Sequence, residues 1–170
     1  MNKSIYILSS LFLYIFFFAS CGEEKDDSQI TIGGEWNVVE RILSTNDPSL
    51  DKNVNELFLE DSRHYKVRRI FDINQGDPSI GAIQTIAIDR QSDVLQRKRI
   101  GTYSITTDSL FIQDELISDF RQKYLLRRTL LETEVKVSKK ELDVLVYEIG
   151  GDPNTVREGT VGVLKMREVK

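Results

Sequence analysis

The chain has 170 residues, with 23 Lys and Arg against 27 Asp and Glu, a formal net charge of −4, and one cysteine. This length suits one domain better than two. A mildly acidic chain offers no electrostatic footprint for nucleic acid or anionic lipid, because both are recognised by clustered Lys and Arg. A single cysteine also excludes an internal disulfide and a metal site built from several cysteines.

The first twenty residues differ from the rest of the chain. Lys3 is the only charge before Glu23, and Ile5 to Phe18 is apolar apart from two serines. A membrane-spanning helix needs about 20 apolar residues, so a run of about 14 is more typical of the hydrophobic region of a signal peptide. We therefore expect residues 1–20 to be a cleaved signal peptide.

Small residues, Ala19 and Ser20, stand directly before Cys21, the sole cysteine. This arrangement resembles a bacterial lipobox, where the cysteine is acylated and the chain is cleaved in front of it. The resemblance implies an outer-membrane lipoprotein of the cell envelope, held by acyl chains such as palmitate on Cys21. Several chains anchor stably, since each buried methylene contributes about 0.8 kcal/mol. Without Lys3, 22 basic residues face 27 acidic ones, a net charge of −5.

The segment after the cysteine is polar and has nothing to bury, so residues 21–29 are expected to form a flexible tether. Gly22 to Ser28 resembles the short Lys-plus-acidic export tag of surface lipoproteins of Bacteroidetes, and an ordinary solvated linker explains it equally well. A periplasmic and an outer-surface location therefore both stay open.

From Ile30 onward the apolar residues recur mostly with a period of two, which is typical of half-buried strands. Turn residues separate the short runs, and this pattern predicts an antiparallel sandwich or barrel for residues 30–170. Strands are expected at Trp36–Ile42, Leu57–Leu59, Tyr65–Phe71, Ile83–Ile88, Val94–Ile105, Leu110–Gln113, from about Gln122, at Leu142–Val146 and at Val161–Val169.

All three prolines follow an aspartate, at Asp47-Pro48, Asp77-Pro78 and Asp152-Pro153, which marks loops rather than strands. The first connection (about Leu43 to Val54) and the third (about Asp72 to Ala82) are therefore expected to be long. In residues 114–132 the apolar spacing fits both a helix and a strand. We expect a loop or short helix to about Gln122 and then a strand.

The domain opens with Gly34-Glu35-Trp36 at the head of its first strand. G-x-W is the lipocalin signature, in which the tryptophan plugs the closed end of a barrel. Gly101 to Leu110 resembles the family's "GtYsi…dsL" hairpin, and Val135 to Val144 is similar to its late "i..ls...L.l" segment. Together these features resemble the lipocalin-like domains of Bacteroidetes lipoproteins over about Ile32 to Val169.

The resemblance implies a small antiparallel up-and-down β-barrel of eight or nine strands with its closed end near Trp36. Two departures stand out. The T-D-Y motif of transport lipocalins is missing, and Arg167, the candidate to pack over the tryptophan, shares a face with Lys165, which indicates solvent exposure. Successive connections of such a barrel alternate between its ends. Asp47-Pro48 and Asp77-Pro78 are thus expected on one rim, opposite Trp36.

Catalytic chemistry is not indicated. His64 is the only histidine, and strand alternation places it on a polar face with Lys66 and Arg68. Neither metal-ligand spacing nor a nucleophile motif nor a Gly-rich phosphate loop is present, so we expect a protein without enzymatic activity, cofactor or metal. The basic run Gln96 to Arg99 is more typical of a solvated strand or a guarded sheet edge than of a binding site.

Alternation along two strands suggests a polar element in the barrel. If Trp36 points inward, so does Glu40, and if Tyr65 points inward, so does Arg69. A buried ion pair needs further hydrogen bonds or water, so this pair predicts a partly hydrated cavity. The alternative is a bulge or twist that turns both outward. The residues expected to line the cavity are Trp36, Val38, Glu40, Tyr65, Val67, Arg69 and Phe71.

Two classes of function follow from these expectations. In the first, the barrel is a non-catalytic module that binds a small, partly apolar molecule at the cell envelope. In the second, side chains fill the barrel and its outer surface contacts another protein, as in an accessory or inhibitor-like lipoprotein. An accessible empty pocket favours the first, and a packed interior with an apolar outer patch favours the second.

Overall fold

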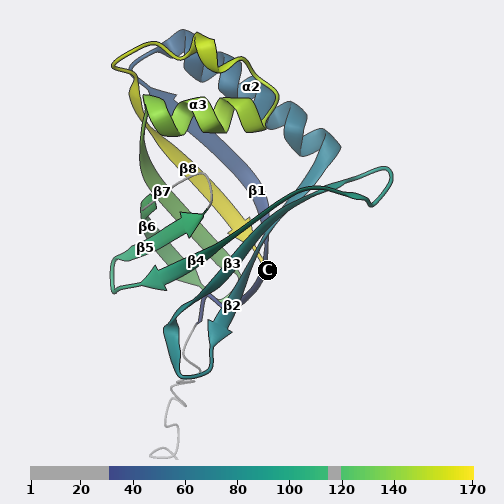
Figure 1. Cartoon of the computed structure of the whole chain (residues 1–170), viewed down its shortest axis with the longest axis vertical. Coiled ribbons are helices and arrows are strands. Elements are labelled where there is room, and N and C mark those ends of the chain that lie inside the picture. Colours follow the sequence, from purple (N-terminus) through teal and green to yellow (C-terminus); the bar gives the residue numbers. More distant parts are fainter. Residues whose placement is uncertain (1–30, 115–119) are drawn as a thin grey trace, which may run out of the picture.

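The computed structural model describes residues 31–114 and 120–170. The predicted signal peptide (1–20), Cys21 and the tether (21–29) lie outside the described residues. Within them, eight antiparallel strands follow one another around a closed barrel, which confirms the predicted all-β up-and-down fold (Figure 1). The strands are β1 (Gly34–Thr45), β2 (Tyr65–Asn74), β3 (Asp77–Asp89), β4 (Leu95–Ile105), β5 (Ser109–Asp114), β6 (Phe120–Arg127), β7 (Leu130–Ser138) and β8 (Val161–Val169).

Two α-helices and one short 3-10 helix interrupt the strand order in the described residues. They are α2 (Pro48–His64), α3 (Lys139–Glu148) and η1 (Pro153–Thr155), and both α-helices lie at one end of the barrel, here called the helix end (Figure 1). The opposite end, where β1 begins, is called the Trp36 end. No helix in residues 31–114 or 120–170 is long and apolar enough to cross a membrane.

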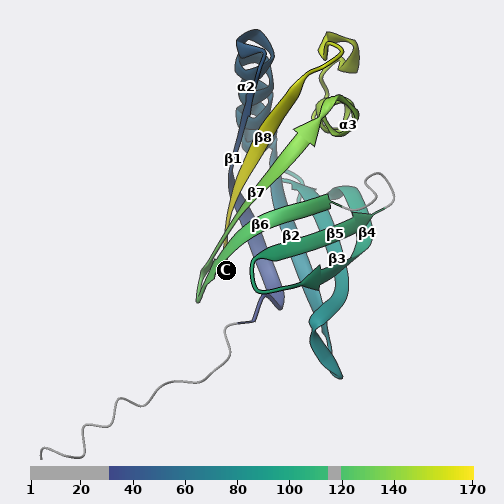
Figure 2. The same ribbon diagram turned by 90° about the vertical axis from the view of Figure 1, so that its left-hand side faces the viewer.

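The barrel closes because β8 pairs with β1, from Asn37 opposite Val169 to Thr45 opposite Gly162. Two other strand pairings cover only part of a strand. β1 pairs with β2 only over Gly34–Asn37, and β5 reaches only the Gly101–Ile105 part of β4. The helix-end halves of β1 and β4 therefore keep one strand neighbour each. Figure 2 shows the result, with β1, β7 and β8 running toward the helices, apart from β4 and β5.

Asp47 and Pro48 begin a helix instead of marking a loop. The Asp47 side chain accepts hydrogen bonds from the Ser49 hydroxyl and from the backbone N–H groups of Leu50 and Ser49, and these bonds lower its pKa. Proline suits the first helical turn. The apolar residues of α2 that are buried lie four apart, at Leu50, Val54 and Phe58. The strand predicted at Leu57–Leu59 is therefore wrong: Leu57 and Leu59 alternate by chance, and Leu59 is exposed.

Helix α2 takes the place of β2 beside the free edge of β1. The Asn55 side chain accepts from Leu43 N–H at 2.8 Å and donates to the Leu43 carbonyl at 2.9 Å, and Asp51 accepts from Thr45 N–H at 2.7 Å. Backbone groups that a neighbouring strand would satisfy are thus paired with side chains.

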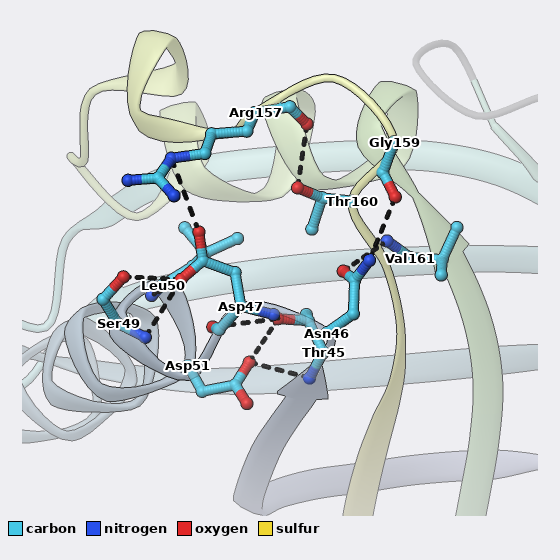
Figure 3. Close-up of polar contacts among 10 residues, drawn as sticks. All are labelled: Thr45, Asn46, Asp47, Ser49, Leu50, Asp51, Arg157, Gly159, Thr160 and Val161. Atoms are coloured by element: carbon cyan, nitrogen blue, oxygen red, sulfur yellow. Dashed lines mark hydrogen bonds and ion pairs between the residues drawn. The ribbon is translucent and has the colours of Figure 1, made fainter.

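Figure 3 shows that the start of α2 is also tied to β8. Asn46 donates to the Gly159 carbonyl at 3.2 Å and accepts from Val161 N–H at 3.1 Å, while Arg157 lies 3.8 Å from Asp47. These contacts join the two chain segments that enter and leave the helix end. They fix where α2 starts over the barrel.

The strand predicted at Leu142–Val146 is also helical. Ser138 and Glu141 form a capping box, Leu142 and Val146 bury one helix face, and Gly150 ends the helix with a φ of +81°. In the ambiguous region, residues 115–119 lie outside the described residues. The predicted strand is confirmed, although it begins as β6 at Phe120, and a second strand, β7, follows it from Leu130.

The barrel interior has two apolar clusters. The cluster at the helix end joins the buried faces of α2 and α3 to β1, β7 and β8. The cluster at the Trp36 end contains Trp36, Phe71 and Tyr103 among others. Trp36 has 0% of its surface exposed and donates through Nε1 to the Ile32 carbonyl at 2.6 Å. Trp36 is thus the largest fully buried side chain and closes its end, as predicted.

Arg167 does not cover the tryptophan. Its side chain is 53% exposed and lies beside Glu132, as the sequence pattern indicated. Lys170 lies over the ring instead, with Nζ 4.8 Å from the ring centroid. A cation therefore packs on Trp36 from the end of the chain, where ring and cation attract each other.

The predicted shared rim is wrong. Asp47-Pro48 lies at the helix end, whereas Asp77 begins β3 at the Trp36 end, after a short turn. Asp72 and Ala82 pair with each other across β2 and β3, so the third predicted connection is a hairpin. The error has one cause: the presumed strand at Leu57–Leu59 is helix, and removing a strand shifts every later connection to the other end.

Candidate functional site: a cavity beneath helix α3

A cavity of about 140 Å³ lies between α3 and the inner face of β2, β3 and β4, and is partly open to solvent. Eleven of its twenty lining residues are apolar, and four of the other nine are arginines. Of the seven predicted lining residues, Val38, Val67 and Arg69 line it. The full set is Val38, Arg41, Val67, Arg69, Thr85, Ile86, Ala87, Arg97, Arg99, Ile112, Asp114, Gln122, Val137, Glu141, Val144, Leu145, Glu148, Ile149, Leu164 and Met166.

Strand register aligns the cavity residues in rows. Arg69 lies opposite Thr85, which lies opposite Arg99. Residues directly opposite each other in neighbouring strands share a face, so the whole row points inward. The interpretation of the basic run as a solvated strand is therefore wrong for Arg99 and for Arg97, which lies in the next row.

A β-bulge changes which residues of β1 face the cavity. The register with β8 shifts between Val38 and Glu40, so the inward positions move from Trp36 and Val38 to Arg41. Glu40 consequently lies exposed on the outer face, opposite Arg167, and the prediction that it lines the cavity is wrong. An extra residue in one strand reverses the alternation beyond it.

Asp61 of α2 holds two of the cavity arginines. It accepts from Arg41 at 2.6 Å and also from Arg97, and its side chain is only 4% exposed. Arg41 lies over the Phe58 ring at 4.8 Å, and Arg97 lies over the Tyr65 ring at 4.9 Å. Tyr65 therefore supports Arg97 and is absent from the cavity lining, contrary to the prediction.

The end of α3 is joined to β4 by two arginines of that strand, Arg97 and Arg99. Arg97 donates to the Glu148 carbonyl, and Arg99 lies 3.3 Å from the Glu148 carboxylate and 3.5 Å from Asp114. Burial raises the pKa of Glu148, and the attraction of Arg99 and Arg97 only partly offsets this. These contacts hold α3 over the cavity.

Arg69 and Gln122, here called the cavity floor, line the cavity on the side of the Trp36 cluster, because Arg69 lies opposite Trp36 and Gln122 lies opposite Leu110 of that cluster. Arg69 pairs there with Glu168, whose surface is 0% exposed. Burial raises the pKa of Glu168, although Arg69 opposes the effect. The predicted inward arginine is thus correct, but its partner is Glu168 of β8 and not Glu40.

Two polar atoms of the floor lack protein partners. Arg69 Nη2 and Gln122 Oε1 have no hydrogen-bond partner among the described residues. Arg69 is 4% exposed and Gln122 is 2% exposed, and both line the cavity. Buried polar atoms are normally paired, so two unpaired atoms on residues that line one cavity are unusual.

The remaining predicted residues lie elsewhere. Trp36 and Phe71 belong to the packed cluster below the floor, where Phe71 meets Tyr103 edge to face at 5.2 Å. His64 is exposed at the end of α2 and lies 2.8 Å from Glu60. Within residues 31–114 and 120–170, no group of three His, Cys, Asp or Glu residues is placed to hold a metal ion.

Comparison of the chain with protein-family models, with curated proteins and with solved structures gives no match.

The raised pKa of Glu148 predicts a pH-dependent difference in stability. Glu148→Gln keeps the shape but cannot ionise. Because the folded state binds the Glu148 proton more tightly than the unfolded chain, wild type loses stability relative to the variant as pH rises through the raised pKa. In urea denaturation from about pH 4 to about pH 7, the unfolding free energy of Glu148→Gln should therefore rise relative to that of wild type.

Glu134→Gln, the same change on the outer face of β7, supplies the control. A difference between Glu148→Gln and wild type that stays constant or shrinks as pH rises would contradict the account of Glu148.

Proposed function

We propose that this protein is a membrane-anchored lipoprotein whose lipocalin-like barrel binds a small, partly apolar molecule in the cavity beneath α3. The observation that carries the proposal is the cavity itself, with an apolar majority in its lining and two unpaired polar atoms at its floor. Binding sites for small molecules combine an apolar lining with a few placed polar groups in this way.

The cavity volume limits the ligand. About 140 Å³ is close to the size of an engineered protein cavity of about 150 Å³ that binds benzene. The enclosed part of the ligand therefore has about six heavy atoms, and any further part extends through the opening. A barrel filled by side chains would leave no such space, which places the protein-interaction alternative second.

The end at which the chain enters the barrel favours ligand access to the cavity from solvent. Ile32 packs in the Trp36 cluster, so the chain enters the barrel at the end opposite α3. A lipid anchor on Cys21 would thus hold the protein by its closed end. The cavity lies at the far end, where the strands spread apart and the helices cover the gap.

The first test fills the cavity. Val67 lines it from β2, and Val67→Phe should occupy part of its volume and displace the ligand. Native mass spectrometry of protein purified from its own host should show a small bound molecule on wild type and none on Val67→Phe. Val161→Phe makes the same change at a 56% exposed position of β8 and should keep the molecule.

Wild type without any bound molecule, or Val67→Phe carrying as much of it as wild type, would overturn the assignment of the cavity as the binding site.

The second test concerns the anchor. Cys21→Ala removes the only thiol and hence the attachment point for acyl chains. In detergent-phase partition, wild type should enter the detergent phase, and the variant should no longer be processed as a lipoprotein or partition in the same way. Equal partition of both proteins into detergent would sink the lipoprotein proposal.

A further inference from the structure

Arg69 and Gln122 reach the cavity floor from opposite sides of the barrel. They lie on β2 and β6, which are four strands apart in either direction around an eight-stranded closed barrel. Arg69 Nη2 offers a donor and Gln122 Oε1 offers an acceptor, each without a protein partner among the described residues. A group lying between them would meet a donor on one side and an acceptor on the other.

The charges around the cavity are balanced. Asp61 pairs with Arg41 and Arg97, and Glu168 pairs with Arg69. The fourth arginine of the lining, Arg99, lies near Asp114 and Glu148. Every cavity arginine thus already faces a carboxylate. An anionic ligand would lose its hydration on entering the cavity and would find each arginine already paired with a carboxylate. Burying a charge without a free partner is costly.

We propose that the cavity floor binds an uncharged group that both accepts and donates a hydrogen bond, such as the hydroxyl of an alcohol or a primary amide. The acceptor atom of this group meets Arg69 Nη2, and its N–H or O–H donates to Gln122 Oε1. The apolar part of the ligand lies above it, against Val67, Ala87 and Val144. The inference deepens the proposed function and rests on it, because it names the class of molecule that the cavity takes.

The test compares three probes of similar size on the full chain in lipid nanodiscs. 1-Pentanol donates and accepts, its isomer butyl methyl ether only accepts, and pentanoate is the anion. Trp36 is the only tryptophan and lies opposite Arg69 in the strand register, so its fluorescence reports binding at the floor. Empty nanodiscs give the background of probe in the lipid.

We expect 1-pentanol to bind about tenfold more tightly than butyl methyl ether, because the ether leaves Gln122 Oε1 unpaired. Pentanoate should bind more weakly than 1-pentanol. Gln122→Met, which keeps the side-chain length but removes the acceptor, should bring the affinity for 1-pentanol close to that for the ether. Gln113→Met, an exposed glutamine on β5, should leave all affinities unchanged.

Several outcomes would overturn the inference. Equal binding of 1-pentanol and the ether would mean that Gln122 turns its amide to donate, or takes no part. Tighter binding of pentanoate would mean that the floor selects an anion. In both cases the proposed function stands, provided that Val67→Phe abolishes binding.

The outcome that refutes the proposed function is different. If none of the three probes changes Trp36 fluorescence beyond the nanodisc background, the cavity binds no small, partly apolar molecule of this size, and the inference fails with the function on which it rests.

Discussion

The ion pair between Arg69 and Glu168 is the constraint on which the interior of this barrel depends. Both side chains are buried, and one atom of each, Arg69 Nη2 and Glu168 Oε2, has no hydrogen-bond partner among the described residues. Removing a charged pair from water is costly unless such atoms are hydrogen-bonded. Below the pair, the Trp36 cluster fills the barrel with apolar side chains. Above it, full apolar packing would enclose the unpaired Arg69 Nη2 in hydrocarbon. The pair thus divides the barrel into a filled half and a half that retains a cavity.

The strands also separate in the half of the barrel that holds the cavity, where β1 and β4 keep one strand neighbour each. Where β1 loses β2 and β4 loses β5, polar groups of the helices contact these two strands. Asn55 and Asp51 serve the backbone of β1, while Asp61 and Glu148 serve the arginines of β1 and β4. The helices therefore help to close the barrel, and they also cover the cavity that we propose as the binding site. A change in how α3 lies over β4 would change the cavity directly.

Much of this could be predicted from the sequence, and the rest could not, for physical reasons. Period-two alternation and Gly34-Glu35-Trp36 were enough for the barrel, the buried tryptophan and the inward Arg69. The sequence contains a start signal for each helix, Asp47-Pro48 for α2 and the Ser138–Glu141 capping box for α3. The short alternating apolar runs within these helices favoured strands instead, so both helices were missed. The Glu168 partner of Arg69 lies 99 residues away, and the bulge between Val38 and Glu40 depends on pairing with β8, so the local spacing of residues reveals neither.

A double-mutant cycle on the ion pair tests the central claim most directly. Arg69→Met and Glu168→Met, alone and together, are compared by chemical denaturation. Each single change leaves a buried charge without its partner and should lower the unfolding free energy by about 3–5 kcal/mol. The double variant, which removes both charges, should lose far less than the sum. Single costs that add to within about 0.5 kcal/mol in the double variant would show that the two residues act independently, and would contradict the account.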